Sequence, residues 1–155
     1  MNDTDTAQIM VRPPLVWVLA AVAGLALDWL VPLRFLPAAL PARTIGAIVF
    51  LAALALFVFA IVTVSRAGTT VRTNLPTTRI VAHGPYRFTR NPIYLAMMLG
   101  LIGLAIAFDD LWLLMLLIPF FLVIRYGVVA REEAYLTRRF GEDYVAYCAR
   151  VRRWL

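Results

Sequence analysis

The chain has 155 residues, of which 63% are hydrophobic and only 15% are charged, and its mean hydropathy is +0.82. Soluble domains are about 45–50% apolar and about 25% charged, so a soluble globule of this size cannot bury so much apolar surface. The excess of apolar residues also excludes intrinsic disorder. We therefore expect an all-α integral membrane protein that forms a single domain over residues 1–155.

The net charge of +6 comes from 15 basic residues, all of them arginine, and nine acidic residues. Because the arginines lie between apolar runs, they indicate positively charged membrane loops, and we expect no nucleic-acid partner. The single Cys148 and the single His83 exclude a cysteine cluster and a multi-histidine metal site. The carboxylates do not cluster as metal ligands either, so we predict no metal.

Four apolar stretches approach the length of about 17–25 residues that a membrane-spanning helix needs. The first begins after a segment with two aspartates and one arginine, which favours a retained span over a cleaved signal peptide, the alternative. Asp109 and Asp110 form a polar turn that makes the last two stretches an antiparallel hairpin, and Pro119 should kink the last one. The predicted transmembrane helices are residues 14–31, 44–64, 92–108 and 111–130.

The distribution of arginine predicts the orientation in the membrane. Five arginines lie in the loop 65–91 and six in the tail 131–155, whereas the first loop has two and the Asp109–Asp110 turn has none. The positive-inside rule therefore places the loop 65–91 and the tail in the cytoplasm. This predicts a multi-pass membrane protein whose N-terminus, loop 65–91 and tail all lie on the cytoplasmic side.

The tail carries an apolar stripe with the spacing of a helix. Leu136, Phe140, Tyr144, Tyr147 and Val151 recur every three or four residues, and Gly141 is a candidate break between two helical pieces. The pattern predicts a C-terminal amphipathic helix. Such a basic helix either lies on the anionic leaflet or folds back over the bundle.

Two polar features are candidates for chemistry. Asn91 suits the N-cap and Pro92 the first position of the third helix, so free N–H groups there attract a carboxylate or phosphate, unless this is an ordinary helix start. The pair Glu132–Glu133 at a membrane boundary either balances neighbouring arginines or binds a cationic or polyhydroxyl ligand. Arg125 lies seven residues before Glu132, on the same face of an ideal helix, and either snorkels to the surface or faces a pocket.

The string HGPYRFTRNPIYLA, a helical hairpin and the string REEAYLTRRFGEDYVAY together resemble the isoprenylcysteine carboxyl methyltransferase and phospholipid N-methyltransferase superfamily. The resemblance covers about residues 78–155. It implies methyl transfer from S-adenosylmethionine, with the cofactor bound at the cytoplasmic mouth of the last hairpin. Carried over by motif, the cofactor-binding residues are Thr78, Arg79, Ile80, Val81, Tyr86, Asn91, Pro92, Ile93, Tyr94 and Glu132.

Two positions depart from this pattern. Superfamily members that methylate isoprenylcysteine have histidine where this chain has Asn91, and they carry a substrate-binding arginine where this chain has Val128. Arg125, one turn earlier, is our candidate for the missing catalytic arginine. His83 invites a general-base role, but its place in a loop favours a solvated or structural one.

The favoured function is methyl transfer to a lipid or lipophilic small molecule with a carboxylate, amine or thiol as acceptor. The expected partners are this lipophilic substrate, entering from the bilayer, and the surrounding membrane lipids. A second hypothesis is an NADPH-dependent membrane reductase related to sterol reductases. Tyr147 and Cys148 of this chain are similar to the C-terminal pattern of those enzymes. A third is a membrane module without catalytic activity.

Overall fold

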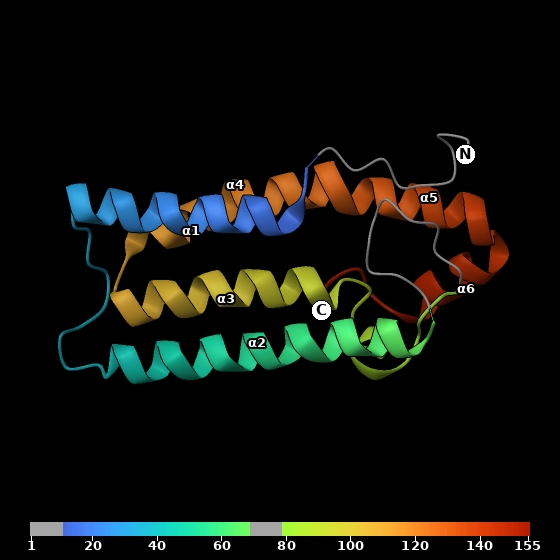
Figure 1. Ribbon diagram of the computed structural model, residues 1–155, viewed down its shortest axis with the longest axis horizontal. Coiled ribbons are helices and arrows are strands. Elements are labelled where there is room, and N and C mark those ends of the chain that lie inside the picture. The colour runs from blue at the N-terminus through green and yellow to red at the C-terminus, as the bar shows by residue number, and fades with distance from the viewer. Residues whose placement is uncertain (1–10, 69–78) are drawn as a thin grey trace.

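The computed structural model describes residues 11–68 and 79–155, and this part of the chain is all helical, without strands (Figure 1). Thr78 lies outside the described residues. The helices form one elongated bundle, from one end of which the C-terminal helices project. The elements are α1 (Pro13–Leu30), α2 (Ala42–Arg66), the 3-10 helix η2 (Gly84–Arg87), α3 (Pro92–Phe108), α4 (Leu111–Leu122), the π-helix η3 (Val123–Val129), α5 (Ala130–Phe140) and α6 (Glu142–Arg150).

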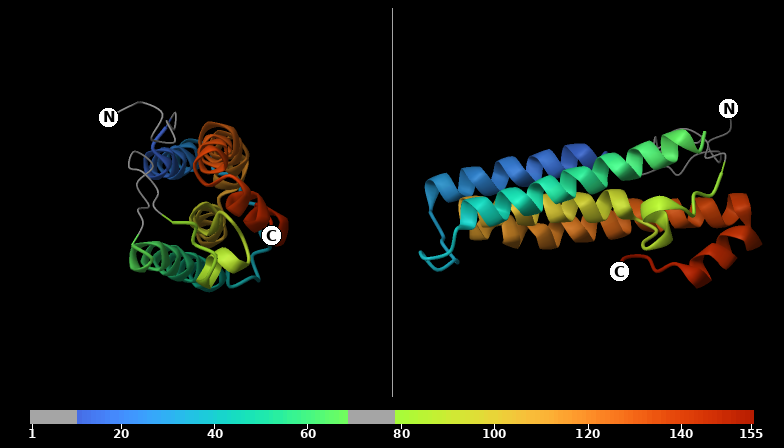
Figure 2. Two further views of the ribbon diagram at one scale, coloured as in Figure 1. Left: turned by 90° about the vertical axis from the view of Figure 1, so that its right-hand side faces the viewer. Right: turned by 90° about the horizontal axis from the view of Figure 1, so that it is seen from below.

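Within residues 11–68 and 79–155, three helices are long and apolar enough to span a membrane, which agrees with the predicted all-α membrane fold. They are α1, α2 and the continuous helix Leu111–Phe140. The 17-residue α3 is apolar but shorter, so the predicted total of about four spans stays a prediction. Helix α3 lies at the centre, with α2 on one side and the pair α1 and α4 on the other (Figure 2).

Glycines allow α2 and α3 to pack closely. A Cβ atom at Gly46 of α2 would lie 2.2 Å from the backbone nitrogen of Ala107, and one at Gly103 of α3 would lie 2.7 Å from that of Phe50. Either distance is too short for a side chain. Small residues at such positions let the backbones of membrane helices approach and gain van der Waals contact.

The predicted turn between the last two apolar stretches is confirmed. Asp109 ends α3 in the left-handed conformation, with φ of 53°, which the short polar side chain of aspartate tolerates better than most. The carboxylate of Asp110 then caps α4 by accepting a hydrogen bond from Leu113 N at 3.2 Å. The two helices form the expected antiparallel hairpin.

The fourth predicted span continues beyond residue 130. Helix α4 contains Pro119 and passes at Val123 into the π-helix η3, which leads without a break into α5 as far as Phe140. Helix bonding of the i→i+5 type has more residues per turn than an α-helix, and it often occurs at functional sites. The π segment therefore changes which residues of α4 and α5 share a face.

The C-terminal tail folds back onto the chain instead of extending away from it. Gly141, with φ of 53°, ends α5, and α6 runs back toward the bundle, as Figure 2 shows. The predicted apolar stripe forms a second small core. Of the two alternatives for the tail, a helix on the anionic leaflet or one that folds back over the bundle, the structure has the second. The buried members of this core are Tyr144, Tyr147 and Val151, packed against Ile80, Leu136, Phe140 and Cys148.

Candidate active site

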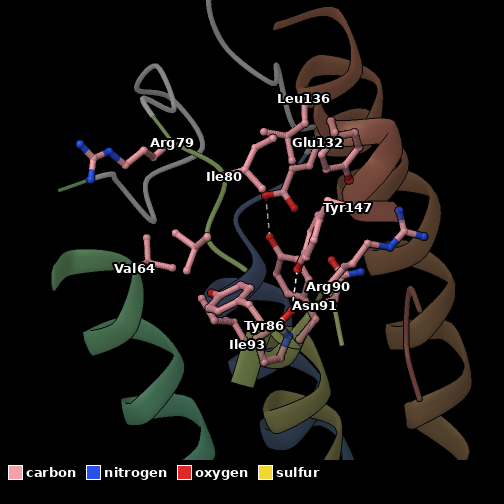
Figure 3. Close-up of a pocket in the computed structure, with 14 residues that line it drawn as sticks. Val64, Arg79, Ile80, Tyr86, Arg90, Asn91, Ile93, Glu132, Leu136 and Tyr147 are labelled. Atoms are coloured by element: carbon pink, nitrogen blue, oxygen red, sulfur yellow. Dashed lines mark hydrogen bonds between the residues drawn. The ribbon is translucent and has the colours of Figure 1, made fainter. Parts of the chain in front are cut away.

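A cavity lies at the end of the bundle where α3 begins, between the end of α2, the loop before α3, α5 and α6 (Figure 3). We call this end of the molecule the site end. Both apolar and polar side chains face the cavity. Its lining residues are Val64, Arg79, Ile80, Val81, Tyr86, Arg90, Asn91, Pro92, Ile93, Tyr94, Glu132, Leu136, Tyr144 and Tyr147.

A hydrogen bond joins the two helices of the hairpin across this cavity. The hydroxyl of Tyr94, in the first turn of α3, donates to the Oε1 atom of Glu132 in α5 at 2.8 Å (Figure 3). The pair is separated by 38 residues in the sequence. Tyr94 is buried and therefore fixes the position of a carboxylate that lines the cavity.

Three tyrosines form a neutral wall. The hydroxyl of Tyr147 donates to the backbone carbonyl of Tyr86 at 2.8 Å, which docks α6 on the 3-10 helix η2. Burial raises the pKa of Tyr147 to about 12. Burial is also the main cause that raises the pKa of Tyr86 and of Tyr144 well above the ordinary value. These hydroxyls stay protonated at physiological pH, so they offer hydrogen bonds and apolar ring surface and carry no charge.

The segment after α6 returns to the start of α3 and binds it through backbone carbonyls. Arg90 N donates to the carbonyl of Arg152 at 3.0 Å. The carbonyl of Arg153 accepts from Thr89 Oγ1 at 3.1 Å and from Asn91 Nδ2 at 2.9 Å. We call this set of contacts the C-terminal clasp. The segment after α6 that contains Arg152 and Arg153 therefore helps to hold the site together.

The side chain of Asn91 belongs to the clasp. This residue does occupy the N-cap position of α3, as predicted, and Pro92 is the first helical residue. The Asn91 side chain, however, makes no capping hydrogen bond, because its amide is used to hold Arg153. With no acidic side chain in the first turn of α3 either, the N–H groups at this helix start remain available to an anionic group.

Glu133 closes the clasp through two arginines. Its two carboxylate oxygens accept from Arg153 Nε at 2.9 Å and from an Arg153 terminal nitrogen at 2.6 Å, and its Oε1 lies 3.2 Å from Arg90. The hydrogen bonds that Arg153 donates to Glu133 raise the pKa of Arg153, which keeps the guanidinium charged. The Glu132–Glu133 pair was expected either to balance neighbouring arginines or to bind a ligand. Glu133 does pair with arginines, whereas Glu132 lines the cavity.

The structure brings most of the predicted cofactor residues together. Thr78 lies outside the described residues, and every other one lines the cavity: Arg79, Ile80, Val81, Tyr86, Asn91, Pro92, Ile93, Tyr94 and Glu132. Their assignment to a cofactor stays a prediction. Sequence reasoning missed the lining residues Val64, Arg90, Leu136, Tyr144 and Tyr147. The apolar stripe of the tail was a usable signal for the last three.

Arg125 and His83 do not line this cavity. Arg125 is half-buried in the π-helix, and its guanidinium lies 5.4 Å from the ring centre of Tyr126. In an α-helix, residues seven positions apart lie on the same face. Because the π-helix has more residues per turn, Arg125 and Glu132 do not lie on the same face here. The proposed catalytic role of Arg125 stays a prediction. His83 is exposed just before η2, in keeping with the solvated or structural role expected for it.

Residues 41–143 match the phospholipid methyltransferase family over well more than half of the chain. The chain belongs to this family. It is also 38% identical over 63 residues to an uncharacterized protein of Haemophilus influenzae, an alignment that covers 41% of this chain and all of that relative. The matched range of this phospholipid methyltransferase family member contains the whole hairpin and Glu132, and it ends before Arg152 and Arg153 of the clasp.

Membership confirms the resemblance to a membrane methyltransferase and favours this activity over the reductase hypothesis. The three apolar helices and the family together identify an integral membrane protein. The hydrogen-bonded pair Tyr94 and Glu132 thus lies within the matched range, at the site end of the apolar bundle.

Proposed function

We propose that the protein transfers a methyl group from S-adenosylmethionine to a lipid or lipophilic small molecule. The observation that carries the proposal is the carboxylate of Glu132, fixed by Tyr94 in the cavity of a phospholipid methyltransferase family member. A carboxylate held at the end of an apolar bundle, with no arginine hydrogen-bonded to it in the described part of the chain, is suited to a cationic or polyhydroxyl ligand.

The chemistry of the cavity fits this cofactor. Glu132 suits the cofactor's ammonium group or ribose hydroxyls, and the N–H groups at the start of α3 suit its carboxylate. Arg90 adds positive charge beside that helix start, and its buried Nε has no hydrogen-bond partner among the described residues. The rings of Tyr86 and Tyr147 offer an apolar surface to an adenine.

S-adenosylmethionine supplies an electrophilic methyl group on a sulfonium. The protein therefore has to align donor and acceptor and to exclude water, and it need not form a covalent intermediate. The neutral tyrosine wall and the apolar side chains of Ile80, Val81 and Ile93 serve this exclusion. An acceptor carboxylate or thiolate needs no base, whereas an amine has to lose a proton.

We also propose that the site end faces the cytoplasm of a bacterial inner membrane, where the cofactor is made. The loop 65–91 and the tail 131–155 hold 11 of the 15 arginines, in keeping with the positive-inside rule. The polar groups of the cavity would then meet the aqueous cofactor, and the apolar bundle would meet the acceptor's hydrocarbon.

Calorimetry on detergent-purified protein tests the proposal with S-adenosylhomocysteine and, in parallel, NADPH. Wild type should bind the first and not the second. Glu132→Gln keeps size and removes charge, so it should lose about 1.5–3 kcal/mol, or about tenfold to a hundredfold in affinity. Glu142→Gln, at an exposed position on α6, is the matched control and should bind like wild type. NADPH binding alone, or an unaffected Glu132→Gln variant, would refute this assignment.

A further inference from the structure

Helix α6 forms one wall of the candidate active site and projects from the end of the bundle. It contributes Tyr144 and Tyr147 to the lining, and the other lining residues come from α2, α3, α5 and the segment 79–91 (Figure 3). The described residues leave a cavity of about 160 Å³. Pockets that enclose a drug-sized ligand usually measure about 300–1,000 Å³. A ligand as large as a nucleoside joined to an amino acid therefore needs one wall to move.

Gly141, between α5 and α6, has the properties of a hinge for this wall. Its φ of 53° lies in the left-handed region, which glycine adopts at little cost. The residue is exposed, and a Cβ atom at this position would meet no atom of the described residues within 4 Å. Packing among these residues therefore does not oppose a change in the backbone angles of Gly141, and such a change at one position is how a hinge moves a lid.

Two contacts of the segment after α6 hold the far end of this wall. Arg153 donates to both carboxylate oxygens of Glu133, and its side chain is 38% exposed, so water and salt reach the ion pair. The ring of Trp154 packs on the ring of Phe121, with the ring centres 5.4 Å apart. The buried Nε1 of Trp154 has no hydrogen-bond partner among the described residues, so undocking restores its hydration. Water can therefore replace the polar partners of both residues when this end of the chain detaches.

We propose that α6 and residues 151–155 form a lid over the candidate active site. The lid swings about Gly141 and is latched by Arg153 on Glu133. It opens to admit and release the cofactor and closes to exclude water during methyl transfer. The inference rests on the proposed function for the identity of the ligand, and it adds how access to the same site is controlled. Closure also forms the carbonyl contacts of the clasp, which hold the start of α3 beside the cavity.

Three variants separate the latch and the hinge from the rest of the lid. Arg153→Gln removes the charge that pairs with Glu133. Gly141→Ala places a side chain at a left-handed position, so it disfavours the closed lid without touching the latch. Arg150→Gln is the matched control, because it removes the same charge from an exposed position on α6, where Nε of Arg150 donates to the carbonyl of Ala146 in the same helix.

Double electron–electron resonance on detergent-purified protein measures the position of the lid without any ligand. Nitroxide labels at Ala149→Cys on α6 and Ser65→Cys near the end of α2, both exposed positions, report the distance between these helices in a Cys148→Ser background. Wild type and Arg150→Gln should give one narrow distance distribution. Arg153→Gln and Gly141→Ala should give a broader one that extends to longer distances. The same distribution in all four proteins overturns the lid.

Binding kinetics of S-adenosylhomocysteine, measured by surface plasmon resonance, separate a lid from a merely structural contact and from the proposed function. In Arg153→Gln, association and dissociation should both be about tenfold faster than in wild type and Arg150→Gln, because both rates scale with the open fraction. Faster dissociation without faster association indicates a structural contact and overturns the lid. If the ligand binds none of the proteins while the distances still depend on Arg153, the proposed function fails and the lid stands. If all bind at equal rates and the distances coincide, the lid fails alone.

Discussion

Replacing Glu133 with glutamine should destabilise the fold, whereas the same change at the adjacent Glu132 should not. Glu133 accepts two hydrogen bonds from Arg153 and pairs with Arg90, and the side chains of Glu133 and Arg90 are only 17% and 13% exposed. Breaking a fully buried ion pair costs about 3–5 kcal/mol, and an exposed pair is worth about 0–1 kcal/mol. Because Arg153 is 38% exposed, we place the cost between these limits, at about 2–3 kcal/mol.

Thermal unfolding in one detergent, followed by circular dichroism, measures this cost. For a chain of this length, a loss of 2–3 kcal/mol lowers the melting temperature by about 4–12 °C. Glu133→Gln should show this fall, and Glu132→Gln should melt close to wild type while losing affinity for S-adenosylhomocysteine. Equal melting temperatures for Glu133→Gln and wild type would contradict the stabilising role of Glu133. An equal fall for both variants would contradict the assignment of stability to Glu133 alone.

Three further predictions follow from the site geometry. Tyr94→Phe removes the hydroxyl that orients the cavity carboxylate, so calorimetry should show about tenfold weaker S-adenosylhomocysteine binding, and unchanged affinity would contradict this. In a Cys148→Ala background, an impermeant reagent added to intact cells should label Ala39→Cys, between α1 and α2, and not Ala149→Cys on α6; the reverse pattern would invert the topology. Arg125→Ala should leave cofactor affinity intact, and a fully active variant would reject the acceptor role predicted for Arg125.

The helices could be predicted from the sequence because each is a property of a local run of residues. Pro92 and the Asp109–Asp110 turn delimit α3, and the structure has this helix at the predicted 92–108. The glycine break at Gly141 and the stripe that includes Tyr144 and Tyr147 were also local patterns, and both are confirmed. Length and hydropathy determine such features before any tertiary contact forms.

The sequence could not show that Glu132 lines the cavity while Glu133 pairs with the arginines of the clasp, because both roles depend on contacts between distant residues. Glu132 meets Tyr94 across 38 positions, and Asn91 meets Arg153 across 62. Two neighbouring glutamates look alike in a sequence, yet on a helix they point in directions about 100° apart, so one faces the cavity and the other faces the clasp. Only the return of the C-terminal segment reveals which is which.

The register of Arg125 could not be predicted for a different reason. Counting seven residues back from Glu132 assumes α-helical bonding throughout, and the π-helix Val123–Val129 interrupts it. Pro119, four residues before that segment, was a visible sign that the hydrogen-bond ladder is irregular here, although not of how the helix adapts.

Polar residues hold loops and chain segments together at both ends of the hairpin, and among the described residues only at the site end does a further carboxylate line a cavity. At the turn end, Asp28 pairs with Arg34 at 3.2 Å, and Asp109 accepts from the backbone N–H groups of Phe35 and Leu36. These contacts close loops. At the site end, Glu133 and the clasp perform the same structural task, which leaves Glu132 beside a cavity that the fold alone does not require. Because a carboxylate at the edge of an apolar bundle is costly, its position there is best explained by a ligand that it binds.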